Sequence, residues 1–206
     1  MNFKTASLAE PLACCLNGFE ISNVKKNSDI LIIGGGPIGL ILSKLSYLYQ
    51  ARNIILIEKS DIKVKLIKKL TSHIDYILDG NKEKNIKIIN QITQNKGVDY
   101  IFTANSDQNT HIESFEYISN NGTINLFGGI PNNTKIKIPV NDIHYKQLKL
   151  VGSHGSKYEH HKNAVKILDS KQLKLDFLFT HNFSLKEISK AFQCAKKNNS
   201  LKVTVN

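Results

Sequence analysis

From residue 29 onward, short runs of apolar, often β-branched residues alternate with stretches in which apolar residues recur every three or four positions. The runs predict buried strands, and the periodic stretches predict amphipathic helices. The predicted strands are residues 29–35, 53–59, 74–78, 98–104, 122–129 and 148–153, and the predicted helices are residues 37–50, 63–70, 85–95 and 112–120. Near-continuous apolar strands that alternate with helices are typical of a parallel sheet covered on both faces. The predicted fold class is therefore α/β, with a doubly wound parallel sheet.

The pattern changes after about residue 155. The sequence there predicts a helix over residues 156–172, a short strand over 175–181, a helix over 184–198 and a terminal strand over 201–206. Ser184 and Glu187 have the spacing of a capping box at the start of the last helix. These elements do not continue the alternating series, so we expect them to form part of another domain.

A glycine-rich turn follows the first predicted strand and precedes the first predicted helix. The segment GGGPIG has the Gly-x-Gly-x-x-Gly spacing at Gly34, Gly36 and Gly39. In a dinucleotide-binding turn the first glycine permits the turn, the second lets the backbone approach the pyrophosphate, and the third lets the helix pack on the strand. Pro37 suits the first helical position, and Ile38 follows it at a helix start whose free amides suit a diphosphate. The alternative is a glycine-rich turn in a nucleotide-free sheet.

An acidic residue closes the second predicted strand. Glu58 stands where a carboxylate can hydrogen-bond the adenosine ribose of a dinucleotide. A carboxylate there repels a 2′-phosphate, so the predicted cofactor is NAD rather than NADP. Lys63 follows closely enough to cover the outer ribose or the adenine.

Composition and charge narrow the classes of function. The chain has 206 residues, of which 41% are hydrophobic and 22% charged, as in ordinary globular proteins. Its net charge of +11 comes almost entirely from dispersed lysines, with Arg52 as the single arginine, and this favours a solvated surface over a nucleic-acid partner. No run approaches the roughly 20 apolar residues that cross a membrane. Cys14, Cys15 and Cys194 predict reduced thiols, and a secretory signal is not evident, so we expect a cytoplasmic protein.

Several motifs together resemble the later part of a zinc-dependent medium-chain dehydrogenase of the polyol or sorbitol-dehydrogenase-like branch. They are EPLACCLNG, ILIIGGGPIGL, GTINLFGGIP, IHYKQLKLVGSHGS and FTHNFSLKEISKAF. The resemblance implies a Rossmann NAD-binding domain inserted into a GroES-like catalytic domain. By this resemblance, residues 1–17 are a hinge and a remnant of the catalytic domain, residues 18–155 are the NAD-binding domain, and residues 156–206 are the C-terminal part of an incomplete catalytic domain.

The resemblance also implies an activity. The family's substrates are secondary alcohols of sugars and polyols, oxidised by hydride transfer to NAD with a zinc ion that lowers the pKa of the alcohol. It places Phe127, Gly128 and Gly129 near the nicotinamide and Glu10 at or beside the catalytic zinc. Asn105 departs from the pattern, because many relatives keep a small residue there.

The family's other zinc ligands lie in an N-terminal part that has no matching motif here. We therefore expect zinc to be absent from this chain and the chain to be inactive without that part. A homodimer is implied by resemblance alone. The alternatives are a non-catalytic NAD(H)-binding module, a truncated gene product and, least favoured, a basic nucleic-acid binder.

Overall fold

A larger and a smaller parallel sheet organise the chain. The computed structural model describes residues 1–197 and 199–206, and within them six strands form the larger sheet and two form the smaller. The larger sheet contains β1 (Asp29–Ile33), β2 (Asn53–Ile57), β3 (Tyr76–Leu78), β4 (Val98–Thr103), β5 (Ile118–Leu126) and β6 (Lys149–Gly152). Its strand order is β3-β2-β1-β4-β5-β6, and every neighbouring pair is parallel. The predicted doubly wound sheet is confirmed, and the strand order reverses between β1 and β4.

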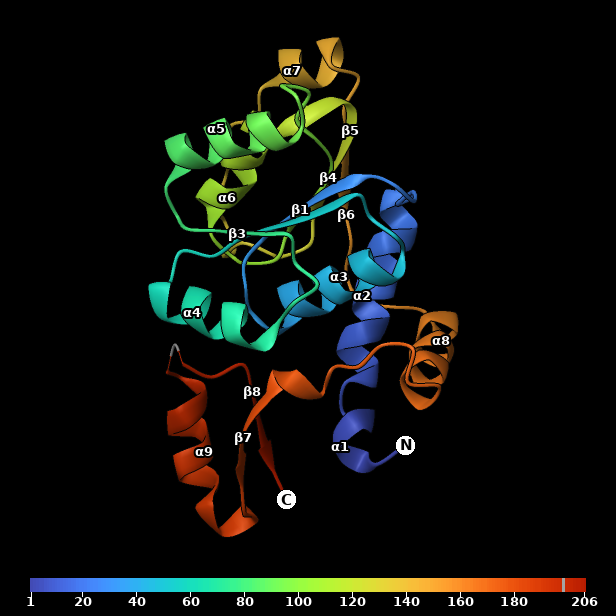
Figure 1. Cartoon of the computed structure of the whole chain (residues 1–206), viewed down its shortest axis with the longest axis vertical. Coiled ribbons are helices and arrows are strands. Elements are labelled where there is room, and N and C mark those ends of the chain that lie inside the picture. Colours follow the sequence, from blue (N-terminus) through green and yellow to red (C-terminus); the bar gives the residue numbers. More distant parts are fainter. Residues whose placement is uncertain (198) are drawn as a thin grey trace.

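Helices cover both faces of this sheet. The helices are α1 (Phe3–Ala6), α2 (Ala9–Ser22), α3 (Pro37–Leu48), α4 (Asp61–Leu70), α5 (Lys82–Ile92), α6 (Gln108–Glu113), α7 (Val140–Tyr145), α8 (Tyr158–Asp169) and α9 (Ile188–Ala195), with short 3-10 segments η1 (Ser114–Glu116), η2 (Asp176–Leu178) and η3 (Leu185–Glu187). Figure 1 shows α3 and α4 on one side of the sheet and α5 and α6 on the other. None of these described helices is long and apolar enough to cross a membrane.

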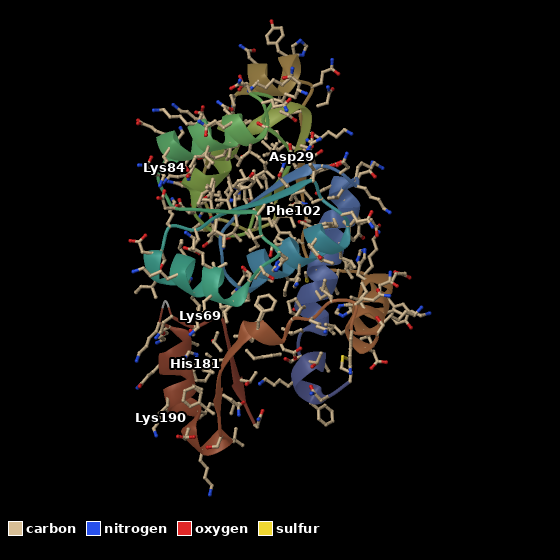
Figure 2. The ribbon with its side chains drawn as sticks, in the orientation of Figure 1. Asp29, Lys69, Lys84, Phe102, His181 and Lys190 are labelled. Atoms are coloured by element: carbon tan, nitrogen blue, oxygen red, sulfur yellow. The ribbon has the colours of Figure 1, made fainter. Side chains whose placement is uncertain are left out.

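Alternate residues of each strand enter two different cores. Ile30 and Ile32 of β1 join the cluster formed with α2, α3 and α4, whereas Leu31 and Ile33 join the cluster on the α5 side. Figure 2 marks Phe102 of β4 within the sheet. Its ring stacks on that of Phe19 from α2, with centroids 5.1 Å apart. Burial on both faces explains why the strands are apolar at nearly every position.

The predicted helix over residues 112–120 is wrong at its C-terminal end. The helical segment begins earlier, at Gln108, and β5 already starts at Ile118. The Val98 amide donates to the carbonyl of Tyr117 (2.9 Å), and Val98 then pairs with Ile118. The register shifts before Tyr100 pairs with Thr123, so β5 carries extra residues there. Pairing with a distant strand therefore overrides the local helical pattern.

The EPLACCLNG segment, which the resemblance predicts as a hinge between two domains, forms most of helix α2. Pro11 lies in the first turn, where a proline is tolerated because its missing N–H would have no helical partner. The helix continues to Ser22, so the predicted boundary between residues 17 and 18 falls inside it. Asn125 of β5 fixes α2 on the sheet, because its Nδ2 donates to the carbonyl of Gly18 (3.1 Å) and to Ser22 Oγ (2.8 Å).

The C-terminal residues form the smaller sheet and its helix. β7 (Phe179–Phe183) and β8 (Lys202–Val205) pair in parallel, and α9 packs on them. The capping box of Ser184 and Glu187 is confirmed, although the first turn is 3-10 rather than α-helical. The helical segment predicted over 184–198 ends at Ala195, and Asn198 lies outside the described residues. The side chain of Phe192 on α9 is 65% exposed. Membership of residues 156–206 in a GroES-like domain stays a prediction.

A buried histidine predicts how stability depends on pH. His73 is 8% exposed, and its Nε2 lies 2.9 Å from Ser43 Oγ of α3. Burial, together with the nearby Lys44, lowers the pKa of His73 from 6.5 to about 4. His73 is therefore protonated more readily in the unfolded chain than in the folded chain. The free energy of unfolding should fall by up to ~3 kcal/mol as the pH decreases from 6.5 to about 4.

The measurement is urea unfolding, followed by far-UV circular dichroism, at several pH values between 7 and 4. His73→Gln should lose this part of the pH dependence, whereas His144→Gln, at an exposed position of α7, should keep it. An identical slope in the wild type and His73→Gln would contradict the assignment.

Candidate functional site

The turn between β1 and α3 depends on two glycines. Gly34 has a φ of +119°, a backbone conformation that residues with a Cβ rarely adopt. A Cβ on Gly34 would also lie 2.7 Å from the carbonyl oxygen of Ala104, and a Cβ on Gly39 would collide with the carbonyl oxygen of Gly34. The first and third glycines therefore allow the close backbone contacts that the spacing predicts.

The middle glycine leaves open space at the start of α3. Gly36 is the N-cap of this helix and has no side-chain cap, and Pro37 occupies the first turn as predicted. A Cβ on Gly36 would have no neighbour within 4 Å among the described residues. The amides of Ile38 and Gly39 lie in the first turn, where intrahelical acceptors are missing. This end of α3 thus offers free donors and a positive dipole to an anion.

Glu58 connects the second strand to this turn. Its Oε2 accepts a hydrogen bond from the Gly35 amide (3.0 Å), and its Oε1 accepts one from the Ser60 amide (2.8 Å). The carboxylate therefore braces the glycine turn from the end of β2. Each carboxylate oxygen has a second lone pair, so Glu58 can still accept from a hydroxyl group.

A cavity of about 290 Å³ lies where the carboxyl ends of β1, β2 and β4 meet. Its lining consists of Ile33, Gly34, Gly36, Ile57, Glu58, Lys59, Lys63, Ala104, Asn105 and Asp107. In open α/β sheets, ligands bind outside the carboxyl ends of the strands where the strand order reverses. The structure therefore brings together the predicted residues Glu58, Lys63 and the glycine turn at such a point.

Two lining residues were not predicted from the sequence. Lys59 and Asp107 form an ion pair, with Nζ 2.8 Å from Oδ2. Asn105 shapes the same loop, because its Nδ2 donates to the Ile33 carbonyl (3.2 Å) and its Oδ1 accepts from the Asp107 amide (3.0 Å). The signal that could have found them is their position just after β2 and β4, at the carboxyl edge of the sheet.

Phe127, Gly128 and Gly129 follow β5 at the same sheet edge but are not among the described lining residues of the cavity. The Gly128 amide donates to the Thr103 carbonyl (2.7 Å), and a Cβ on Gly128 would collide with the backbone of Asn105. The ring of Phe127 packs closely on α2. A Cβ added to Gly18 of this helix would lie only 2.9 Å from the ring. Gly129 has open space around it. Their contact with a nicotinamide stays a prediction.

Glu10 lies in the first turn of α2 and accepts a hydrogen bond from the Cys14 thiol (3.2 Å). Burial and the Glu10 carboxylate raise the pKa of Cys14, which favours the neutral thiol. In the part of the chain that the structure describes, no three His, Cys, Asp or Glu side chains approach closely enough to hold a metal ion. These residues therefore do not fit a complete zinc site, and a role for Glu10 beside zinc stays a prediction.

Two adjacent histidines of α8 have different partners. His160 is buried, accepts the Lys157 amide at Nδ1 (3.0 Å) and lies 2.8 Å from Glu20 through Nε2. His161 Nε2 instead lies 2.9 Å from Ser156 Oγ. The first histidine thus ties α8 to α2, and the two rings do not converge on one point.

Known proteins resemble this chain in both sequence and fold. The sequence profile described as zinc-binding dehydrogenase matches residues 37–170. D-arabinitol dehydrogenase 1 of Uromyces fabae is 26% identical and matches 97% of this chain and 57% of its own length. D-arabitol-phosphate dehydrogenase of Enterococcus avium is 28% identical and matches 100% of this chain and 58% of its own length.

A zinc-binding dehydrogenase of Sinorhizobium meliloti, solved bound to NADP, superposes with a TM-score of 0.84 at 25% identity, over 97% of this chain and 58% of its own. The chain thus spans little more than half the length of these relatives.

Two alanine substitutions separate the roles of the glycines. Gly39→Ala forces its methyl group against the Gly34 carbonyl and should lower the free energy of unfolding by about 3 kcal/mol or more. In Gly36→Ala the added methyl group meets no neighbour, and the φ of −74° at this position suits alanine. The free energy of unfolding should therefore change by less than about 0.5 kcal/mol. Urea unfolding of the two variants measures both effects. Equal stabilities would contradict the close packing described for this turn.

Proposed function

The chain belongs to the zinc-binding dehydrogenase family, and we propose that it is the NAD-binding portion of a dehydrogenase that oxidises a secondary alcohol of a polyol or sugar alcohol. The observation that carries the proposal is the cavity in which the glycine turn, Glu58 and Lys63 meet at the carboxyl edge of the sheet. Its position outside the ends of β1, β2 and β4 is where doubly wound sheets bind dinucleotides.

The residues present fit a dinucleotide. The amides at the start of α3 would receive the pyrophosphate, since Gly36 leaves the space above them open. Glu58 would accept hydrogen bonds from the adenosine ribose, and Lys63 would cover the outer ribose or the adenine. The carboxylate of Glu58 would repel a 2′-phosphate, which supports NAD over NADP. When bound, the nicotinamide would accept the hydride that the alcohol carbon releases.

The substrate class rests on the relatives. Two of them bear the names D-arabinitol dehydrogenase 1 and D-arabitol-phosphate dehydrogenase. Their similarity extends over nearly the whole of this chain, so we propose a polyol or sugar alcohol as substrate.

The proposed chemistry needs ligands from outside this chain. Because the described residues contain no group of three metal-binding side chains, zinc would require residues supplied by another polypeptide segment, with Glu10 at or beside the metal. We propose that the chain alone binds NAD(H) without oxidising alcohols. The same observation favours a second candidate function, a non-catalytic NAD(H)-binding module.

Location and assembly are further parts of the proposal. All three cysteines are free thiols, which suits a reducing compartment, and we propose the cytoplasm. β3 and β6 are the edge strands of the larger sheet, and the family resemblance supports a homodimer formed through such an edge.

Titration of the chain with NADH, followed by the fluorescence of the reduced nicotinamide, tests the proposed function. The wild type should bind NADH, and Gly36→Ala should raise the Kd at least ~10-fold, because its methyl group occupies the space of the pyrophosphate. Circular dichroism should show the same fold in both. A folded wild-type chain that does not bind NADH would contradict the proposal.

Activity assays separate the two candidate functions. Arabitol, NAD and Zn²⁺ added to the chain alone should give no NADH. Restored turnover on adding the N-terminal half of a full-length relative would favour the dehydrogenase portion, and NADH binding that never leads to turnover would favour the binding module. Turnover by the chain alone would contradict the account of its incomplete metal site.

A further inference from the structure

An ion pair joins two loops at the mouth of the cavity. Lys59 follows β2 and Asp107 follows β4, and the two side chains meet at 2.8 Å although 48 positions separate them. Both line the 290 Å³ cavity together with Glu58 and Lys63.

Asp107 is the fixed member of the pair. Its Oδ1 accepts the Asn109 amide (3.0 Å) as the N-cap of α6, and its own amide donates to Asn105 Oδ1 (3.0 Å). Lys59 has a long, flexible side chain, so the aspartate determines where the ammonium group lies. The hydrogen bond to Asp107 also raises the pKa of Lys59, which keeps this lysine charged.

The charges around the cavity are balanced. Among the described lining residues, Glu58 and Asp107 are acidic and Lys59 and Lys63 are basic. A 2′-phosphate would place roughly two negative charges next to Glu58. Accommodating it requires a cation that is free to approach, and Lys59 is already paired with Asp107.

We propose that Asp107 is a specificity-determining residue, which holds Lys59 away from the adenosine ribose and thereby makes the chain select NAD(H) over NADP(H). This inference rests on the proposed function and adds a second determinant to Glu58. Glu58 repels the 2′-phosphate directly, whereas Asp107 keeps Lys59, which would otherwise bind the phosphate, in an ion pair.

Asp107→Asn tests the inference, because asparagine can still cap α6 while losing the charge that holds Lys59. NADPH affinity should rise ~10-fold and NADH affinity should change by less than ~3-fold, as measured by fluorescence titration of both cofactors. Asp107→Ser, which also removes the charge and can also cap the helix, should give the same shift.

Two further variants serve as controls. Asp142→Asn removes the same charge from the Lys146–Asp142 pair (3.2 Å) on α7, outside the described cavity lining, and should keep the wild-type ratio of the two affinities. The double variant Asp107→Asn/Lys59→Gln should lose the gain, because the freed lysine is what binds the phosphate.

The outcomes distinguish the inference from the proposed function. A wild type that binds neither cofactor overturns both. A wild type that binds NADH, combined with an unchanged ratio in both Asp107 variants, overturns the inference alone. A double variant that keeps the gain would also overturn it, since Lys59 would then not be the group that binds the phosphate.

Discussion

The structure depends on the close backbone contacts at the end of β1. Gly34 turns the chain directly beneath the carbonyl oxygen of Ala104, and Gly39 brings α3 against the carbonyl oxygen of Gly34. No side chain with a Cβ fits at either position without moving the backbone. This contact places the N-terminus of α3 beside the carboxyl ends of β1 and β4, and Gly36, its N-cap, lines the cavity. The candidate site is thus a consequence of how tightly the first strand and helix pack.

Polar groups hold the surrounding elements in register with that turn. Glu58 joins the end of β2 to the Gly35 amide, and Asn105 joins the loop after β4 to the Ile33 carbonyl. On the other side of the sheet edge, the buried Asn125 binds α2 through the Gly18 carbonyl and accepts Ser153 Oγ (2.9 Å) from the segment after β6. Because unsatisfied buried polar groups are costly, these bonds specify one arrangement of the loops.

Much of this arrangement could be predicted from local sequence patterns. Apolar β-branched runs indicated all six strands of the larger sheet, because strands buried on both faces leave a strong signal. The glycine spacing and Glu58 could be placed together because parallel strands end at a common edge. The start of β5 was predicted wrongly, since it depends on pairing with Val98. The helical conformation of α2 was not predicted from the sequence. The pairing of Lys59 with Asp107 was missed, because it joins side chains from two loops that only the fold brings together.

A crystal structure of the chain with NADH tests the central claim most directly. The account predicts the diphosphate at the amides that begin α3 and the adenosine ribose hydroxyls on Glu58, with the Lys59–Asp107 pair intact beside them. A dinucleotide bound elsewhere on the chain, or at the same edge with its diphosphate away from α3, would contradict it.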